Sequence, residues 1–352
     1  MLFRKKIDPR CAYCVKGTRI SDREVACVKC GVVAAEHHCS AFRYDPLKRV
    51  PPRPVKLHTG DLKQEDFDLS GGHTMKLKKV WAVYFSGTGT TRRTVERIAG
   101  DIAARLGLPV QSVDFSRPAL RQETLRFSDT DLVVFGTPVY AGRVPNVLLP
   151  FLQEKVVGGG ALAVPVVLFG NRNYDDALME LRNILIADGL HPIAAGAFVG
   201  EHSFSRVLGQ GRPNAEDTAQ MDRFAARTAE LVSGLESAPQ NPVAVGGQEP
   251  IRPYYTPRDR AGNPINILKV KPKTDLSRCG GCGLCAELCP MGSIDPADVS
   301  QVKGICIKCC ACVKGCPTGA KFFDDAGYLY HRHELEAEYA RPAANEVFYI
   351  QL

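Results

Sequence analysis

The pattern of apolar positions predicts that the middle of the chain alternates between strands and helices. Short, nearly continuous apolar runs rich in β-branched and aromatic residues occur at 80–85, 110–115, 131–135, 161–169 and 192–199. Apolar residues recur at helical spacing near 95–106, 144–152, 175–187 and 214–235. Buried strands that alternate with helices are typical of a parallel sheet covered on both faces. The sequence therefore predicts a doubly wound α/β domain with a five-stranded parallel sheet.

Two stretches that favour linkers separate this domain from its neighbours. The first is polar and ends in a glycine pair, and the second carries seven prolines, so no regular element is expected inside it. We expect the second linker to lie against a domain surface. The predicted organisation is a basic module at 1–58, a linker at 59–76, the α/β domain at 77–236, a proline-rich linker at 237–272, a cysteine-rich domain at 273–330 and a tail at 331–352.

Composition narrows the class of protein. The chain has 352 residues, 45% of them hydrophobic, which suits two or three domains with sizeable cores. It has no run of about eighteen apolar residues and no apolar segment after the charged start, so we expect neither a membrane span nor a secretory signal. Of the net charge of +7, residues 1–60 hold 13 Lys and Arg against 5 Asp and Glu. A basic partner surface is therefore expected only in the N-terminal module.

The turn after the first predicted strand, Ser86-Gly87-Thr88-Gly89-Thr90-Thr91, joins a strand end to a helix start. Glycine lets the backbone approach an anion, and a helix N-terminus offers free N–H groups. The loop lacks the lysine of a nucleoside-triphosphate loop, and Arg92 stands in place of the third glycine of G-x-G-x-x-G, which disfavours a dinucleotide. Its hydroxyls are neutral donors and predict a site for one phosphate monoester.

This loop resembles that of flavodoxins, whose pattern Ser/Thr-x-Thr-Gly-x-Thr is matched here. The resemblance implies strand order 2-1-3-4-5 and FMN as ligand, with the ring between the loops after the third and fourth strands. Tyr140 and Tyr174 are expected to stack on the ring, and the peptide between Ala141 and Gly142 to meet flavin N5. The alternative is ordinary βα turns, with Asp175 capping a helix. The expected FMN-binding residues are Ser86, Gly87, Thr88, Gly89, Thr90, Thr91, Pro138, Val139, Tyr140, Ala141, Gly142, Asn171, Arg172, Asn173, Tyr174 and Asp175.

A C-x2-C-x2-C-x3-C-P motif begins at Cys279 and is repeated from Cys306. In such repeats three close thiolates bind one cluster, and the cysteine before proline binds the partner cluster. Zinc is the alternative metal for thiolates, but eight cysteines in this order favour iron–sulfur clusters. The segment resembles bacterial two-cluster ferredoxins, which implies a small α+β domain. Cys310, an extra cysteine, is expected to be a buried filler or to have a redox or ligand-swap role. The predicted ligands are Cys279, Cys282, Cys285 and Cys316 for 4Fe–4S cluster I, and Cys306, Cys309, Cys312 and Cys289 for 4Fe–4S cluster II.

The N-terminal module has the cysteine spacing of a zinc ribbon. A short chain of this kind cannot build an adequate apolar core, so a bound metal would supply its stability. Iron in a rubredoxin-like site is the alternative, and Cys39 either replaces one ligand or is free. The basic residues of the module fit nucleic-acid binding, docking of an acidic protein, or an ordinary solvated surface. The predicted zinc ligands are Cys11, Cys14, Cys27 and Cys30.

Over residues 77–330 the chain resembles anaerobic flavodoxin–ferredoxin fusion proteins. The resemblance implies electron transfer between FMN and two 4Fe–4S clusters, linking a low-potential donor to a redox protein or small acceptor, in the cytoplasm of an anaerobic prokaryote. One alternative is a flavin-site reductase of a small acceptor, with Arg143 and Arg172 as the charged groups in the loops and His202 as a further candidate. The other is a redox sensor whose zinc ribbon binds nucleic acid.

Overall fold

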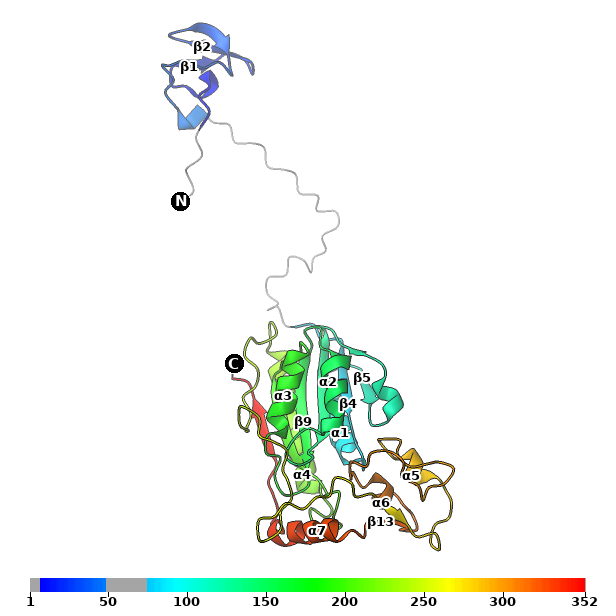
Figure 1. The fold of residues 1–352 in the computed structure, drawn as a ribbon. Helices are drawn as coiled ribbons and strands as arrows, with labels where there is room; N and C mark the ends of the chain where they lie inside the picture. Colours follow the sequence, from blue (N-terminus) through cyan, green and yellow to red (C-terminus); the bar gives the residue numbers. More distant parts are fainter. Residues whose placement is uncertain (1–6, 49–74, 352) are drawn as a thin grey trace. The chain divides into compact units, whose positions relative to one another are not determined.

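The computed structural model describes residues 7–48 and 75–351, and the chain divides into two compact units, Met1–Leu69 and Ser70–Leu352 (Figure 1). Most of the linker predicted at 59–76 lies outside the described residues. The described part of the first unit has few buried apolar side chains: Cys11, Cys14, Val25 and Cys27. It forms an antiparallel sheet of β1 (Gly17–Arg19), β2 (Glu24–Cys27) and β3 (Gly31–Ala34), flanked by the 3-10 turns η1 (Cys11–Tyr13) and η2 (Pro46–Lys48).

The second unit is built on a sheet with five parallel strands. In spatial order these are β5 (Val110–Asp114), β4 (Lys79–Tyr84), β7 (Asp131–Pro138), β9 (Leu162–Phe169) and β11 (Ala194–Val199). The central strands are buried on both faces, as their apolar sequences require. The short strand β10 (His191–Pro192) pairs with β9, while β6 (Leu125–Arg126) and β8 (Val156–Val157) form a separate pair.

Helices cover both faces of this sheet (Figure 1). One face packs against α1 (Thr90–Leu106) and α4 (Ala215–Ser233), and the other against α2 (Leu149–Lys155) and α3 (Ala177–Ala187). The 3-10 turns η4 (Pro118–Arg121) and η5 (Asn146–Leu148) lie in connecting loops. The predicted α/β fold with a parallel sheet is confirmed. None of the helices in 7–48 and 75–351 is both long and apolar enough to cross a bilayer.

The C-terminal segment, predicted as a tail beyond residue 330, is integrated into the fold. Helix α7 (Ala326–Glu338) crosses that boundary, and β14 (Glu346–Tyr349) pairs antiparallel with β11. The sheet thus has an antiparallel edge strand that the five-strand prediction did not include. A four-residue strand whose partner lies about 150 residues away leaves too little local pattern to be recognised.

The cysteine-rich segment is small, and a two-stranded antiparallel pairing joins its two ends. Strand β12 (Lys273–Thr274) pairs with β13 (Lys321–Phe322), and α5 (Leu284–Glu287) and α6 (Ala311–Lys314) lie between them. The preceding proline-rich linker contains no helix or strand and lies against the domain, as predicted. The backbone N–H of Tyr255 donates to the Ala141 carbonyl at 2.8 Å, and the Tyr254 hydroxyl donates to the Val144 carbonyl at 2.8 Å.

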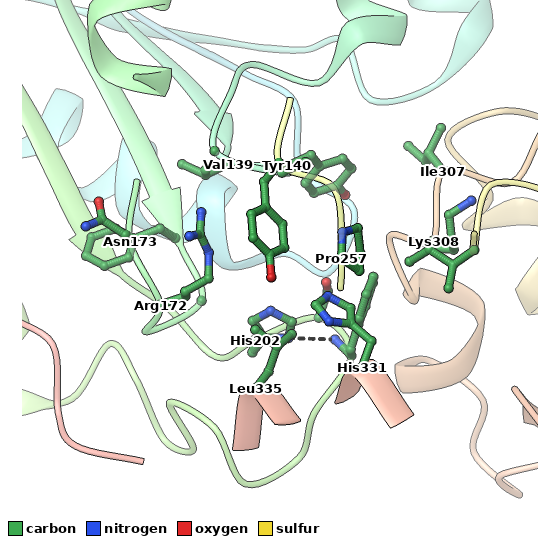
Figure 2. Close-up of a pocket in the computed structure, with 18 of the residues that line it drawn as sticks. Val139, Tyr140, Arg172, Asn173, His202, Pro257, Ile307, Lys308, His331 and Leu335 are labelled. Carbon is green, nitrogen blue, oxygen red and sulfur yellow. Dashed lines mark hydrogen bonds between the residues drawn. The ribbon is translucent and has the colours of Figure 1, made fainter. Parts of the chain in front are cut away.

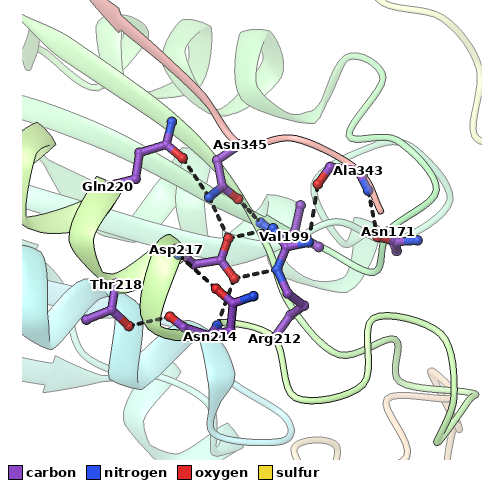
Figure 3. A network of polar contacts seen from close by, with 9 residues as sticks. All are labelled: Asn171, Val199, Arg212, Asn214, Asp217, Thr218, Gln220, Ala343 and Asn345. Atoms are coloured by element: carbon purple, nitrogen blue, oxygen red, sulfur yellow. Dashed lines mark hydrogen bonds and ion pairs between the residues drawn. The ribbon is translucent and has the colours of Figure 1, made fainter. Parts of the chain in front are cut away.

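A buried polar network fastens the C-terminal segment to the sheet (Figure 3). Asp217, near the start of α4, pairs with Arg212 and accepts from Asn345 Nδ2 at 2.8 Å. Asn345 Oδ1 accepts in turn from the backbone N–H of Val199, at the end of β11, at 2.7 Å. The capping box at Asn214 starts α4 beside this network. One asparagine therefore joins a helix, a central strand and the approach to β14.

Substituting Asn345→Ala should destabilise the second unit by about 1–3 kcal/mol, because the buried partners of its amide lose their hydrogen bonds. Denaturant unfolding followed by the fluorescence of Trp81, the single tryptophan, measures this. The exposed Asn241→Ala is the matched control and should leave the unfolding free energy unchanged. Equal stability of the two variants would contradict the anchoring role.

Candidate functional site

The predicted phosphate loop, residues 86–91, lies at the carboxyl end of β4 and leads into the first turn of α1. Gly89 precedes α1 with a left-handed φ of 86°, and no side chain caps the helix at this position. The Ser86 hydroxyl accepts from the Arg92 N–H at 3.2 Å, while Thr90 and Thr91 are buried. The N–H groups of Thr90 and Thr91, the first two of α1, therefore remain available for an anion, while that of Arg92 is taken by Ser86.

A cavity of about 520 Å³, here called the phosphate-loop cavity, lies over this loop. Four of its six cations are already paired: Arg212 with Asp217, Lys314 with Glu201, Arg117 with Glu287 and Arg92 with Glu96. The prediction of neutral donors alone was incomplete, because the excess of cations favours a phosphate dianion. The charged side chains that line the cavity are Arg92, Arg93, Arg117, Arg206, Arg212 and Lys314, against Asp114 and Glu201.

Two further cavities continue along the strand ends. A middle cavity of about 70 Å³ shares Gly87 and Thr88 with the phosphate-loop cavity. It shares Val139 and Tyr140 with a third cavity of about 210 Å³, which we call the aromatic cavity after its tyrosine and phenylalanine lining (Figure 2). Shared lining residues place the three cavities next to one another, in a row from the phosphate loop past the ends of β7 and β9, and we call this row the groove. A ligand with a phosphate at one end and a ring at the other fits this arrangement.

Part of the predicted ring site lines the groove. Pro138 lines the middle cavity. The aromatic cavity receives residues from both loops that were expected to flank the ring: Val139, Tyr140, Ala141, Gly142, Arg172 and Asn173.

Three other predicted residues do not line the aromatic cavity, because the C-terminal segment and a local ion pair engage them. The buried Asn171 amide donates to the carbonyls of Tyr339 and Arg341 at 2.7 and 2.9 Å. The Tyr174 hydroxyl donates to Glu346 at 2.7 Å, so its ring is not free to stack on a flavin. Asp175 pairs with Arg172. These side chains support the loop.

Several lining residues were missed by sequence reasoning, since they come from segments with no flavodoxin-like pattern. The proline-rich linker contributes Tyr255, whose ring lies under the Arg172 guanidinium at 4.7 Å and stacks on His331 at 6.1 Å. The only sequence signal for it is a pair of tyrosines in a linker expected to pack on a surface. The missed residues are Tyr255, Pro257, Ile267, Leu268, Ile307, Lys308, His331 and Leu335.

Of the side chains considered as substrate contacts in a reductase of a small acceptor, Arg143 lies outside the groove and His202 lines it. Arg143 pairs with Glu180 and lies 4.5 Å from the Tyr254 ring, so it does not line the groove. His202 does line it, but burial, with Lys314 and other cations nearby, lowers its pKa to about 3. Its Nδ1 accepts from the Phe204 N–H at 3.1 Å. His202 is therefore a neutral acceptor near pH 7 and a poor proton donor.

The cysteines predicted to bind cluster II line the same cavity. Cys289 of the first motif and Cys306, Cys309 and Cys312 of the second line a single, largely apolar cavity, here called the inner cysteine site. Cys309 also lines the middle cavity beside Tyr140. A Cβ atom placed on Gly87 would lie 3.1 Å from the Cβ of Cys309 and 3.6 Å from its Sγ. The inner cysteine site therefore adjoins the phosphate loop.

The remaining cysteines of this segment differ in exposure. Cys282 is exposed and Cys279, Cys285 and Cys316 are partly buried. Cys310 is buried, with its Sγ 3.4 Å from the Tyr328 hydroxyl, and burial raises its pKa to about 11. It packs with Phe323 and Tyr328, as the filler interpretation requires.

The N-terminal cysteines form a loose group. Backbone N–H groups of Lys29 and Cys30 lower the pKa of Cys27, and a hydrogen bond with Cys39 raises the pKa of Cys30 to about 11. Cys39 therefore lies beside a predicted ligand. In the described parts of the chain, 7–48 and 75–351, no three His, Cys, Asp or Glu side chains converge closely enough to hold one metal ion.

Asp176 anchors the linker that carries Tyr255, and the anchor should weaken in acid. Its buried carboxylate accepts from the Arg252 side chain at 2.6 and 2.8 Å, and this pairing lowers its pKa from 3.8 to about 2. The attachment should therefore hold above about pH 4 and be lost as pH falls toward 2.

At neutral pH, substituting Asp176→Asn should speed the hydrogen exchange of the backbone amides of residues 248–255 about tenfold, because the linker loses this attachment. The exposed Asp129→Asn is the control, and equal exchange in the two variants would refute the anchor.

Comparisons with known proteins agree with two parts of this description. Residues 82–169 match the flavodoxin domain family, and residues 272–295 match the 4Fe-4S binding domain family. The second match includes the first cysteine motif, and the repeat from Cys306 lies beyond it. No curated protein matches the chain.

Solved structures give distant similarities. An archaeal flavodoxin is 16% identical, with 44% of this chain and 98% of that chain covered at a TM-score of 0.32. An NADH:FMN oxidoreductase is 16% identical, with 45% and 91% covered at 0.32. A rubredoxin oxygen:oxidoreductase from the anaerobe Desulfovibrio gigas is 15% identical, with 46% and 38% covered at 0.30. From the family matches, the chain contains a flavodoxin-like domain within 82–169 and a 4Fe–4S ferredoxin domain within 272–295.

Proposed function

We propose that this protein transfers electrons between FMN and two 4Fe–4S clusters held in one chain, linking a low-potential donor to an acceptor outside it. The observation that carries this proposal is the position of Cys309. It lines both the inner cysteine site and the middle cavity beside the phosphate loop. FMN, when bound, exchanges one or two electrons, and each cluster exchanges one. A shared cysteine wall brings the two kinds of site into contact without a diffusive encounter.

The groove fits FMN in shape and charge. The proposed phosphate site is the loop from Ser86 to Thr91, whose free N–H groups and surrounding arginines suit a dianion. The proposed ring site is the aromatic cavity, where Tyr140 is kept as the stacking residue and Tyr255, held between Arg172 and His331, forms part of the wall. The mostly apolar and aromatic lining suits a flat ring, and Arg172, Asn173 and Lys308 add polar groups at its edge.

For the two clusters we propose the ligand sets expected from the sequence, in which each cluster binds three cysteines of one motif and the fourth cysteine of the other. The four thiols of the inner cysteine site fit one cluster, because Cys289 lies with the second motif and not with its own. The more exposed set, Cys279, Cys282, Cys285 and Cys316, is proposed for the other cluster.

The N-terminal module is proposed to hold zinc through Cys11, Cys14, Cys27 and Cys30, whose thiols would have to draw closer together than they lie in this structure when the metal binds. Its buried apolar residues are nearly all thiols, so a metal is the natural source of stability. Any nucleic-acid contact is assigned to this module, where the excess basic charge lies. Thiolate clusters favour a reducing, oxygen-poor compartment, which we propose is the cytoplasm of an anaerobe.

Electron transfer is favoured over reduction of a small acceptor by the composition of the ring site. Its walls include Ile307 and Lys308 of the cysteine-rich segment and His331 of α7. The protein's own chain therefore forms the wall beside the proposed ring site, where a small acceptor would have to bind. Arg143 is paired with Glu180 and is not available to bind such an acceptor.

The test is purification of the full chain without oxygen, followed by cofactor analysis. We expect one FMN and about eight iron and eight acid-labile sulfide per chain. After addition of one electron equivalent, freeze-quenched EPR of the clusters and flavin absorbance should change together. Colourless protein without FMN or sulfide, or loaded protein in which the two signals never exchange, would refute the proposal.

Substituting Thr88→Asp should weaken FMN binding by at least about tenfold, because a carboxylate at the phosphate loop repels the phosphate dianion. Titration of the apoprotein with FMN, followed by quenching of flavin fluorescence, measures the Kd. Riboflavin, which lacks the phosphate, is the control ligand, and its affinity should change little. An equal loss of affinity for FMN and for riboflavin would show that the phosphate group does not bind at this loop.

A further inference from the structure

The aromatic cavity is a composite site. The flavodoxin-like part supplies the loops after β7 and β9, while α7 supplies His331 and Leu335 and the cysteine-rich segment supplies Ile307 and Lys308 (Figure 2). Residue 307 is more than 100 positions from the end of the flavodoxin match. The flavodoxin fold alone would leave this wall open.

The loop at residues 305–310 forms the part of this wall that adjoins the inner cysteine site. It carries two residues with left-handed backbone despite their side chains, Lys308 at φ 55° and Cys310 at φ 59°. Such conformations persist only where the surroundings hold them. Lys308 Nζ donates to the carbonyls of Leu268 at 3.0 Å and Cys306 at 2.9 Å, and Cys310 rests against Tyr328.

The same loop supplies two thiols to the inner cysteine site. Cys306 and Cys309 line it together with Cys289 and Cys312, while Ile307, between the first two, also lines both this site and the aromatic cavity. Thiolate bonds to one cluster would fix four points of the chain and so fix this loop. With the thiols unbound, only the Lys308 hydrogen bonds and the contact between Cys310 and Tyr328 would hold the left-handed residues, and the wall of the aromatic cavity would be less firmly fixed.

We infer that loading of the inner cysteine site sets the affinity of the groove for flavin, with the loop at 305–310 as the coupling element. This rests on the cofactors assigned under the proposed function, and it concerns binding, not electron flow. Binding free energies are reciprocal, so flavin also stabilises the loaded inner site. Coupling of this kind typically changes affinity by about 5- to 150-fold.

The test compares two cysteines that occupy equivalent places in the repeat. Cys289→Ser removes a ligand of the inner cysteine site without touching the groove, and Cys316→Ser removes one from the more exposed set. Both full-length proteins are reconstituted with iron and sulfide and titrated anaerobically with FMN. We expect Cys289→Ser to raise the FMN Kd at least about tenfold and Cys316→Ser to change it less than about twofold. Equal Kd values for Cys289→Ser and the unsubstituted chain would overturn the inference, as would an equal loss in both variants.

A second measurement needs no substitution. Saturating FMN should slow the loss of iron to a chelator from the unsubstituted protein, and the same protein without FMN gives the reference rate. Unchanged iron release would also overturn the inference. Failure of the proposed function is distinguishable, because a protein whose FMN and clusters bind cooperatively but never exchange electrons refutes the function alone, and one that exchanges electrons with independent binding refutes the coupling alone.

Discussion

The close contact between Cys309 and Gly87 is favoured by the absence of a side chain at this position of the phosphate loop. A Cβ on Gly87 would meet the Cβ of Cys309 at 3.1 Å and the Tyr140 hydroxyl at 3.6 Å. Because Gly87 has none, the cysteine-rich segment can settle directly on the loop where a phosphate is expected. Residues further out hold it there: Arg121 donates to the Pro290 carbonyl at 2.8 Å, and Lys314 donates to the His202 carbonyl at 2.7 Å.

The location of this contact follows from the topology of the sheet. Parallel strands present their carboxyl ends at one edge, so the loops after β4, β7, β9 and β11 all open on the same side. The groove runs along that edge, and the cysteine-rich segment supplies part of its wall. A segment added after the last helix of the fold can thus reach the ligand site without inserting into the domain.

The charged side chains of the groove have two roles: some hold segments of the chain together, and others attract an anionic ligand. Arg212 and Lys314 are already neutralised by Asp217 and Glu201, so they hold segments together. Arg93 and Arg206 are exposed and form no ion pair among the described residues, so they supply the field for an anion, and salt screens that field. The neutral His202 and the apolar lining at the other end leave little protonic chemistry, which suits a site that handles electrons.

The sequence by itself determined the elements and the chemical types of the sites. Apolar runs and helical spacing predicted the parallel sheet, the glycine–threonine turn predicted a phosphate loop, and the repeated cysteine motif predicted iron–sulfur ligands, because each is a local pattern whose chemistry depends on spacing along the chain. The tertiary structure decided which distant segments meet. Tyr255 enters the groove while Tyr174 is turned to Glu346, and β14 joins β11, since these contacts arise when segments separated by 80 or more residues pack on one sheet edge. Packing of that kind depends on the shape of the folded domain, which no local pattern encodes.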